Sequence, residues 1–78
     1  MDIVISARPE HWADITFFDG MGNQIYPPHT LGYNAIVDYI GDICNEHDIN
    51  SITVVGNKSY IANLIDKLKE KFPTVEIR

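Results

Sequence analysis

Residues 51 to 72 constrain the fold more than any other part of the chain. "SITVVG" (51–56) is a nearly continuous apolar run, as expected of a parallel strand covered on both faces. A helix should follow it, capped by Ser59 and stopped by Pro73. Its apolar stripe recurs at three- and four-residue steps: Ile61, Leu64, Ile65, Leu68 and Phe72. Since "TVEIR" (74–78) predicts a closing strand, this part of the chain predicts parallel strands joined by right-handed crossovers.

The first third of the chain predicts an antiparallel meander. "DIVIS" (2–6) has the β-branched content of a strand, and "WADITFF" (12–18) alternates as a strand does. This alternation places Ala13, Ile15 and Phe17 on one side and Trp12, Asp14, Thr16 and Phe18 on the other. "DGMGN" supplies the Gly and Asn of a tight turn, and "QIY" (24–26) is expected to return as a third strand ended by Pro27-Pro28.

A first helix is expected over residues 31–47, with Thr30 as its N-cap. Its apolar stripe is Tyr33, Ile36, Val37, Ile40, Ile43 and Cys44. The element order is therefore βββαβαβ over a single domain, residues 1–78. The predicted fold class is α/β, with one mixed five-stranded sheet and two helices.

This order resembles the ribonuclease H-like superfamily over essentially the whole chain. "INSITVVGNKSYIANLIDKLKEKFPTVEI" resembles the Holliday-junction-resolvase-like branch, in which a "VVG" strand end precedes a helix and another strand. The hairpin "FDGMGNQI" resembles one in ribosomal proteins of a related fold. The resemblance implies the strand order 3-2-1-4-5 and implies little about activity.

The residues that would carry catalysis in that superfamily are missing. Its nucleases hold two metal ions with carboxylates, one of them near the middle or end of the first strand, where this chain has Ile5, Ser6 and Ala7. Asp19 stands alone in the hairpin and is interpreted as a turn residue. Two metal ions need convergent oxygens, so we expect no enzyme, no catalytic residue, no metal and no cofactor. The nucleotide-binding relatives have a glycine-rich turn after strand one, and "SARPEHWA" has none.

Two short motifs have ordinary structural interpretations beside functional ones. Asn57, Lys58 and Ser59 begin the second helix and form a weak candidate for binding an anion, against an ordinary capped βα turn. Cys44 and His47 are three residues apart, but Cys44 lies on the apolar stripe and is expected to be a core thiol.

The first helix carries the strongest indication of a partner. Asp38, Asp42 and Glu46 are spaced by four, so like charges would face each other along one side, partly at the helix end that disfavours anions. Two readings stay open: a solvated face, or an acidic docking face for a protein with a basic surface. Aromatic residues are expected to add to a partner-binding surface: Trp12, Phe18, Tyr26 and Tyr39. Two helices cannot cover both sheet faces completely, so two readings stay open here as well. One face is left open for a partner or for self-association, or the aromatic side chains complete the core.

The charge distribution favours protein contact over nucleic acid. Residues 1–57 carry eight acids and one base, whereas residues 58–78 carry five bases and three acids. With one cysteine and no apolar segment able to span a membrane, a cytoplasmic location is expected. The function predicted first is a non-catalytic acidic protein-interaction module, suited to an accessory or inhibitor protein of a phage or mobile element. Weak nucleic-acid or phosphate binding through the C-terminal lysines comes second, and a degenerate nuclease-like enzyme third.

Overall fold

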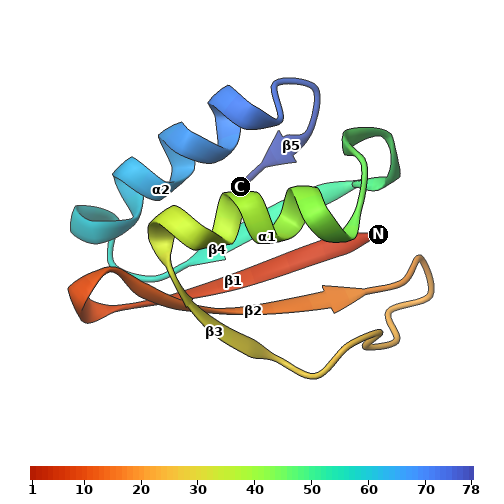
Figure 1. The fold of residues 1–78 in the computed structure, drawn as a ribbon, viewed down its shortest axis with the longest axis horizontal. Helices are drawn as coiled ribbons and strands as arrows, with labels where there is room; N and C mark the ends of the chain where they lie inside the picture. The colour runs from red at the N-terminus through yellow and green to blue at the C-terminus, as the bar shows by residue number, and fades with distance from the viewer.

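The computed structural model describes all 78 residues and contains one five-stranded sheet with two α-helices (Figure 1). The elements follow in this order: β1 (Asp2–Arg8), η1 (Pro9–His11), β2 (Trp12–Phe18), β3 (His29–Gly32), α1 (Tyr33–Ile43), η2 (Glu46–Asp48), β4 (Ser51–Val55), α2 (Lys58–Lys71) and β5 (Glu76–Ile77). The strand order is β3-β2-β1-β4-β5, with β4 parallel to both β1 and β5. The predicted fold class and strand order are therefore confirmed.

Both helices pack on the same face of the sheet, so the molecule has two layers (Figure 1). The strands turn alternate residues toward the helices, and these are almost fully buried: Ile3, Ile5, Ala13, Ile15, Phe17, Ile52 and Val54. The helices contribute Tyr33, Ile36, Ile40, Ile61, Leu64 and Leu68 to the same core. The expectation that β4 is covered on both faces is wrong, because Val55 is 53% exposed on the other face. No helix combines the length and apolar character needed to cross a membrane.

The third strand lies later in the chain than predicted. "QIY" makes only an isolated bridge, between Phe18 and Gln24, and the ladder with β2 resumes at His29, after the two prolines. Thr30 lies in β3 and is not an N-cap; its hydroxyl donates a 2.5 Å hydrogen bond to Asp14 Oδ1. A β-branched residue with a cross-strand partner favours the strand, and this outweighs the capping propensity of threonine.

The helix boundaries also differ from the expectations. Helix α1 runs over Tyr33–Ile43 and is four residues shorter at its C-terminal end than predicted. Its last turn holds Asp42 and no basic residue, so no side chain of that turn offsets the partial negative charge of the helix end. Helix α2 is capped by Asn57 and not by Ser59, because Asn57 Oδ1 accepts hydrogen bonds from both the N–H and the hydroxyl of Ser59.

Asp19 organises the turn after β2. Its Oδ1 atom accepts hydrogen bonds of 2.9 Å from the backbone N–H groups of Met21 and Asn23. The N–H of Gly22 donates to the Asp19 carbonyl at 3.1 Å, and Gly22 has a φ of 84°, which glycine adopts without strain. Every polar contact of Asp19 is thus with its own turn.

We expect the charge of Asp19 to make the stability of the protein depend on pH. The N–H of Asn23, followed by that of Met21, lowers the pKa of Asp19 below its usual 3.8. A lowered pKa contributes stability that is fully present above the unfolded value and is lost as pH falls through the folded value. Asp19→Asn should therefore be less stable than the wild type at neutral pH. Urea midpoints from pH 7 down to about pH 2.5 should show the two proteins converging in acid. A difference independent of pH would contradict this role of the charge.

Candidate functional site

A shallow groove runs along the outside of the helix layer, between α1 and α2. Three adjoining hollows form it, with volumes of about 650, 420 and 390 Å³. The first two hollows share Asn34, Lys67 and Glu70 as lining residues. The last two share Asp38 and Lys71. Because neighbouring hollows have common walls, they form one continuous surface, called here the helix groove.

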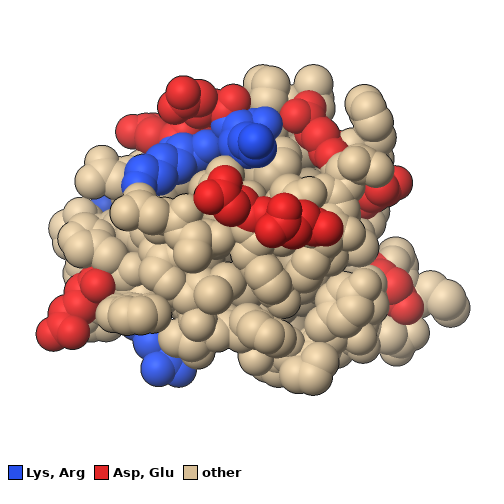
Figure 2. Space-filling model, in the orientation of Figure 1, with Lys and Arg blue, Asp and Glu red and all other residues tan.

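Most of the charged side chains that line the helix groove are carboxylates. Six acidic side chains take part: Glu10, Asp38, Asp42, Glu46, Asp66 and Glu70. Lys67 and Lys71 are the lysines among its lining residues. Figure 2 shows lysine side chains lying as a band between two groups of carboxylates. A segment bound here would meet positive charge along the centre and negative charge on both flanks.

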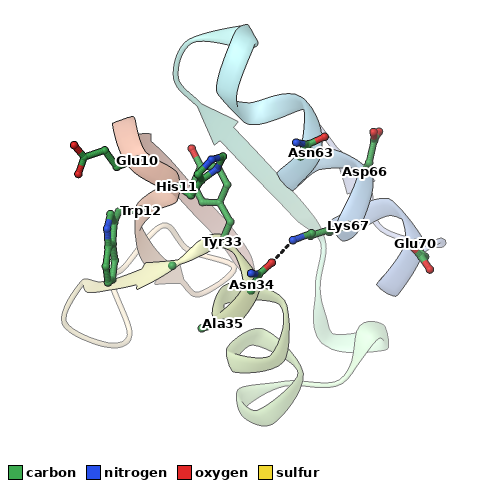
Figure 3. Close-up of a pocket in the computed structure, with 11 residues that line it drawn as sticks. Glu10, His11, Trp12, Tyr33, Asn34, Ala35, Asn63, Asp66, Lys67 and Glu70 are labelled. Atoms are coloured by element: carbon green, nitrogen blue, oxygen red, sulfur yellow. Dashed lines mark hydrogen bonds between the residues drawn. The ribbon is translucent and has the colours of Figure 1, made fainter.

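The six carboxylates make no ion pair within the chain. The salt bridges of the structure are Arg8–Asp14, at 2.7 Å, and Arg78–Glu76, at 3.1 Å. Within the groove, the Lys67 ammonium donates a hydrogen bond to Asn34 Oδ1 (Figure 3). The groove therefore keeps its charges available to a partner.

Aromatic side chains stand at one end of the helix groove, next to the turn between β1 and β2 (Figure 3). Trp12 is 49% exposed there. The rings of His11 and Tyr33 meet edge to face, with centroids 5.4 Å apart. The Tyr33 hydroxyl donates to the Arg8 carbonyl at 3.2 Å, and burial raises the pKa of Tyr33 above its usual value. Tyr33 is thus fixed in place by its contacts, whereas the exposed side chain of Trp12 remains accessible to a partner.

The structure brings some of the predicted site residues together and separates others. Asp38 and Asp42 lie on the exposed side of α1 and line the groove. Glu46 lines it too, but from η2, so the expected spacing along one helix does not hold; its carboxylate accepts from the Thr74 hydroxyl. Tyr39 packs on Phe17 and His29, with ring centroids 5.9 and 5.3 Å away.

Phe18 lies on the sheet face opposite the helices and is part of no groove wall. Asp66, Glu70 and Asn34 complete the helix groove and were missed in the sequence. Asp66 and Glu70 lie four residues apart on the polar side of α2, which is the same spacing that pointed to Asp38 and Asp42. That spacing, applied to both helices, would have found them.

Two other sequence candidates remain: Asn57, which caps α2 away from the helix groove, and Cys44, which lines the third hollow of the groove. Asn57 Oδ1 accepts a hydrogen bond from the backbone N–H of Ser59, and the Asn57 carbonyl accepts from those of Tyr60 and Ile61. Most backbone N–H groups of the first turn of α2 therefore have partners within the chain. Cys44 follows the end of α1; burial raises the pKa of its thiol, and the thiol faces the Ile40 carbonyl at 3.5 Å. No three His, Cys, Asp or Glu side chains cluster closely enough to hold a metal ion.

Comparisons with known proteins define the fold class. No protein-family model matches the chain, and no curated protein matches it significantly. A solved structure from Bacteroides thetaiotaomicron, described as a protein with an actin-like ATPase fold and unknown function, superposes with a TM-score of 0.65 at 18% identity. The match covers 99% of this chain and 32% of the other chain. At this identity the likeness shows the fold alone: the chain has an α/β fold of the actin-like and ribonuclease H-like kind.

Proposed function

We propose that this protein is a non-catalytic interaction module whose helix groove binds a basic segment of a partner protein. The observation that carries the proposal is the lining of one continuous groove by six carboxylates, none of them in an ion pair. The net charge of −5 adds a long-range attraction for basic partners. An accessory or inhibitor role in the cytoplasm, of phage or mobile-element origin, fits such a module and is part of the proposal.

The charge pattern specifies the kind of segment. Lys67 and Lys71 line the middle hollow of the groove together with Asp38 of α1 and Glu70 of α2. Figure 2 shows lysine side chains lying between two groups of carboxylates. A segment in the groove can offer its backbone carbonyls to these two ammonium groups. Its Lys or Arg side chains then reach Asp38 on one flank and Asp66 on the other. A peptide with basic side chains on both edges fits this arrangement best.

The same observations argue against two other functions. For nucleic-acid binding, Lys67 and Lys71 would have to contact phosphates from between carboxylates that repel phosphate. For ATP hydrolysis of the kind named in the neighbour's description, the β1–β2 turn offers Pro9, Glu10 and His11 and no glycine. Within the ribonuclease H-like group we place the chain nearest the resolvase-like branch, with a buried Ile5 where those nucleases carry a carboxylate.

A pair of matched variants tests the proposal. Asp38→Asn with Asp42→Asn removes two groove charges, and Asp48→Asn with Glu76→Gln removes two charges outside it. Calorimetric titration with a lysine-flanked peptide should give roughly tenfold weaker binding for the groove variant and unchanged binding for the control. A glutamate-flanked peptide should not bind. Equal binding by both variants would contradict the groove, and duplex or single-stranded DNA binding more tightly than the peptide would favour the lysines as a nucleic-acid site.

A further inference from the structure

The face of the sheet turned away from the helices is uncovered and partly apolar. Its side chains are those that alternate with the buried ones along β1, β2 and β4. The apolar members are Val4, Phe18, Val55 and Trp12. Val55 is 53% exposed, and Trp12, which is 49% exposed, lies at the start of β2, where this face meets the end of the helix groove that Trp12 also lines. Thr16 and Thr53 lie among them and are half-buried. A contiguous surface of this kind is a candidate interface between proteins.

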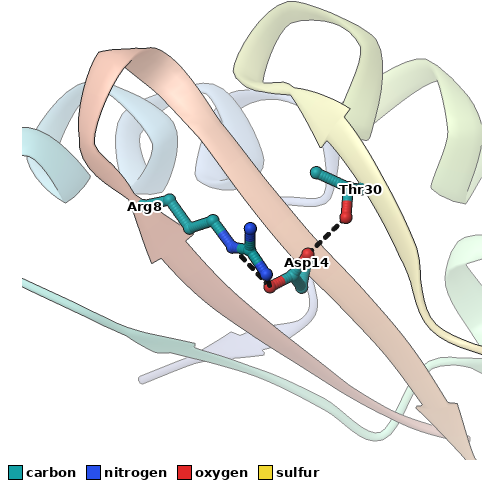
Figure 4. A network of polar contacts seen from close by, with 3 residues as sticks. All are labelled: Arg8, Asp14 and Thr30. Atoms are coloured by element: carbon teal, nitrogen blue, oxygen red, sulfur yellow. Dashed lines mark hydrogen bonds and ion pairs between the residues drawn. The ribbon is translucent and has the colours of Figure 1, made fainter.

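The charged side chains of β1 and β2 on this face already have partners within the chain. The Arg8 guanidinium donates to Asp14 Oδ2, at 2.8 Å from Nε, and the Thr30 hydroxyl donates to Asp14 Oδ1 at 2.5 Å (Figure 4). At the other end of β1, the Ser51 hydroxyl donates to Asp2 Oδ1 at 3.1 Å. These groups can enter an interface with their hydrogen bonds made, so burying them carries a small penalty.

The register of β1 and β2 makes the face complementary to itself. Arg8 lies opposite Trp12 at one end of this ladder, and Asp2 lies opposite Phe18 at the other. A twofold axis between two facing sheets, perpendicular to their strands, reverses the strand direction from one sheet to the other. It sets Arg8 of each copy over Asp2 of the other, and Trp12 of each copy over Phe18 of the other. Such an interface is isologous, with every contact made twice.

We infer that the uncovered sheet face is the interface of a homodimer. A second copy is the occupant that the charges favour, because this face is nearly neutral whereas the helix groove would place acid against acid. The five strands hold 25 residues in all, and about 4.8 by 3.3 Å of sheet for each residue gives on the order of 400 Å² per copy. Two such faces bury roughly 800 Å², below the range of permanent dimers. The dimer is therefore expected to be weak and reversible, and to form only at high protein concentration.

Charge reversal at the two ends of β1 tests the pairing. Arg8→Asp places acid over Asp2 of a second copy, and Asp2→Arg places base over Arg8 of a second copy, so each variant alone should be monomeric. When the two variants are mixed, every facing pair is again of opposite sign, and sedimentation velocity should show a heterodimer at concentrations where the wild type dimerises. Phe18→Ser, which leaves the charges in place, should weaken the dimer at least about tenfold through lost apolar area.

Three outcomes would overturn this inference: a monomeric wild type at every concentration up to its solubility, reversed variants that dimerise as the wild type does, or a mixture that stays monomeric. Circular dichroism confirms that each variant is folded before it is measured. The groove variant Asp38→Asn with Asp42→Asn should dimerise normally, so failure of the dimer and failure of the proposed function are separable.

Discussion

Leu64→Ala should lower the free energy of unfolding by about 2–5 kcal/mol, a large part of what a domain of this size has. Leu64 has no exposed surface and lies in the middle of α2, where it packs into the one core that joins both helices to the sheet. Truncation removes apolar contact and leaves a cavity, and the tight packing of two layers gives little room for collapse. The loss of stability should affect the whole molecule, because both helices and the sheet share one core.

Ile65→Ala is the matched control, one residue further along the same helix. Ile65 is half-buried, so its truncation removes less contact and leaves no closed cavity. Urea unfolding should show a loss for Ile65→Ala of roughly half that for Leu64→Ala or less, with similar m-values. Equal losses for the two variants would mean that α2 does not pack on the sheet in the orientation described.

Gly56→Ala should also destabilise the protein, by about 2–4 kcal/mol. Gly56 follows β4 with a φ of 151°, and a Cβ atom there would come within 2.9 Å of Ala7 Cβ and 3.3 Å of the Ala7 carbonyl oxygen. Ala7 belongs to β1, so neither strand can shift without disturbing the ladder between β1 and β4. The position combines an unfavourable backbone conformation with a steric clash.

Gly20→Ala is the control for this prediction. No atom lies within 4 Å of a Cβ placed at Gly20, so its replacement should change the stability by less than about 0.5 kcal/mol. Thermal unfolding of both variants under one condition makes the comparison. A Gly56→Ala protein as stable as Gly20→Ala would show that the junction of β4 and α2 is looser than the structure describes.

Local sequence patterns predicted most of the fold. The errors occur where contacts between elements distant in the sequence determine the structure. The alternation of Ala13, Ile15 and Phe17 and the helical stripe around Leu64 are local signals, and both elements are where the patterns place them. Thr30 was assigned to a cap because its pairing with Asp14, sixteen residues earlier, cannot be read from a window of sequence. The continuous apolar run of β4 suggested two covered faces, but both helices pack on the same face.

For the same reason, the sequence predicted only part of the candidate site. Asp38 and Asp42 were identified from their spacing on one helix, which is a local property. That Asp66 and Glu70 lie across a groove from them depends on the two crossovers placing α1 and α2 side by side. The sequence indicates the C-terminal lysines only as a second-choice nucleic-acid or phosphate site. That lysine side chains lie between two groups of carboxylates is seen only in three dimensions.

Mapping a bound peptide by NMR tests the central claim most directly. A lysine-flanked peptide is titrated into ¹⁵N-labelled protein at physiological salt, and backbone amide shifts are followed. We predict shifts along the helix groove, at Asn34, Asp38, Lys67 and Lys71, and none at Thr53 or Phe18 on the open sheet face. Shifts confined to the open sheet face, or no shifts at any peptide concentration, would contradict the assignment of the helix groove as the partner-binding site.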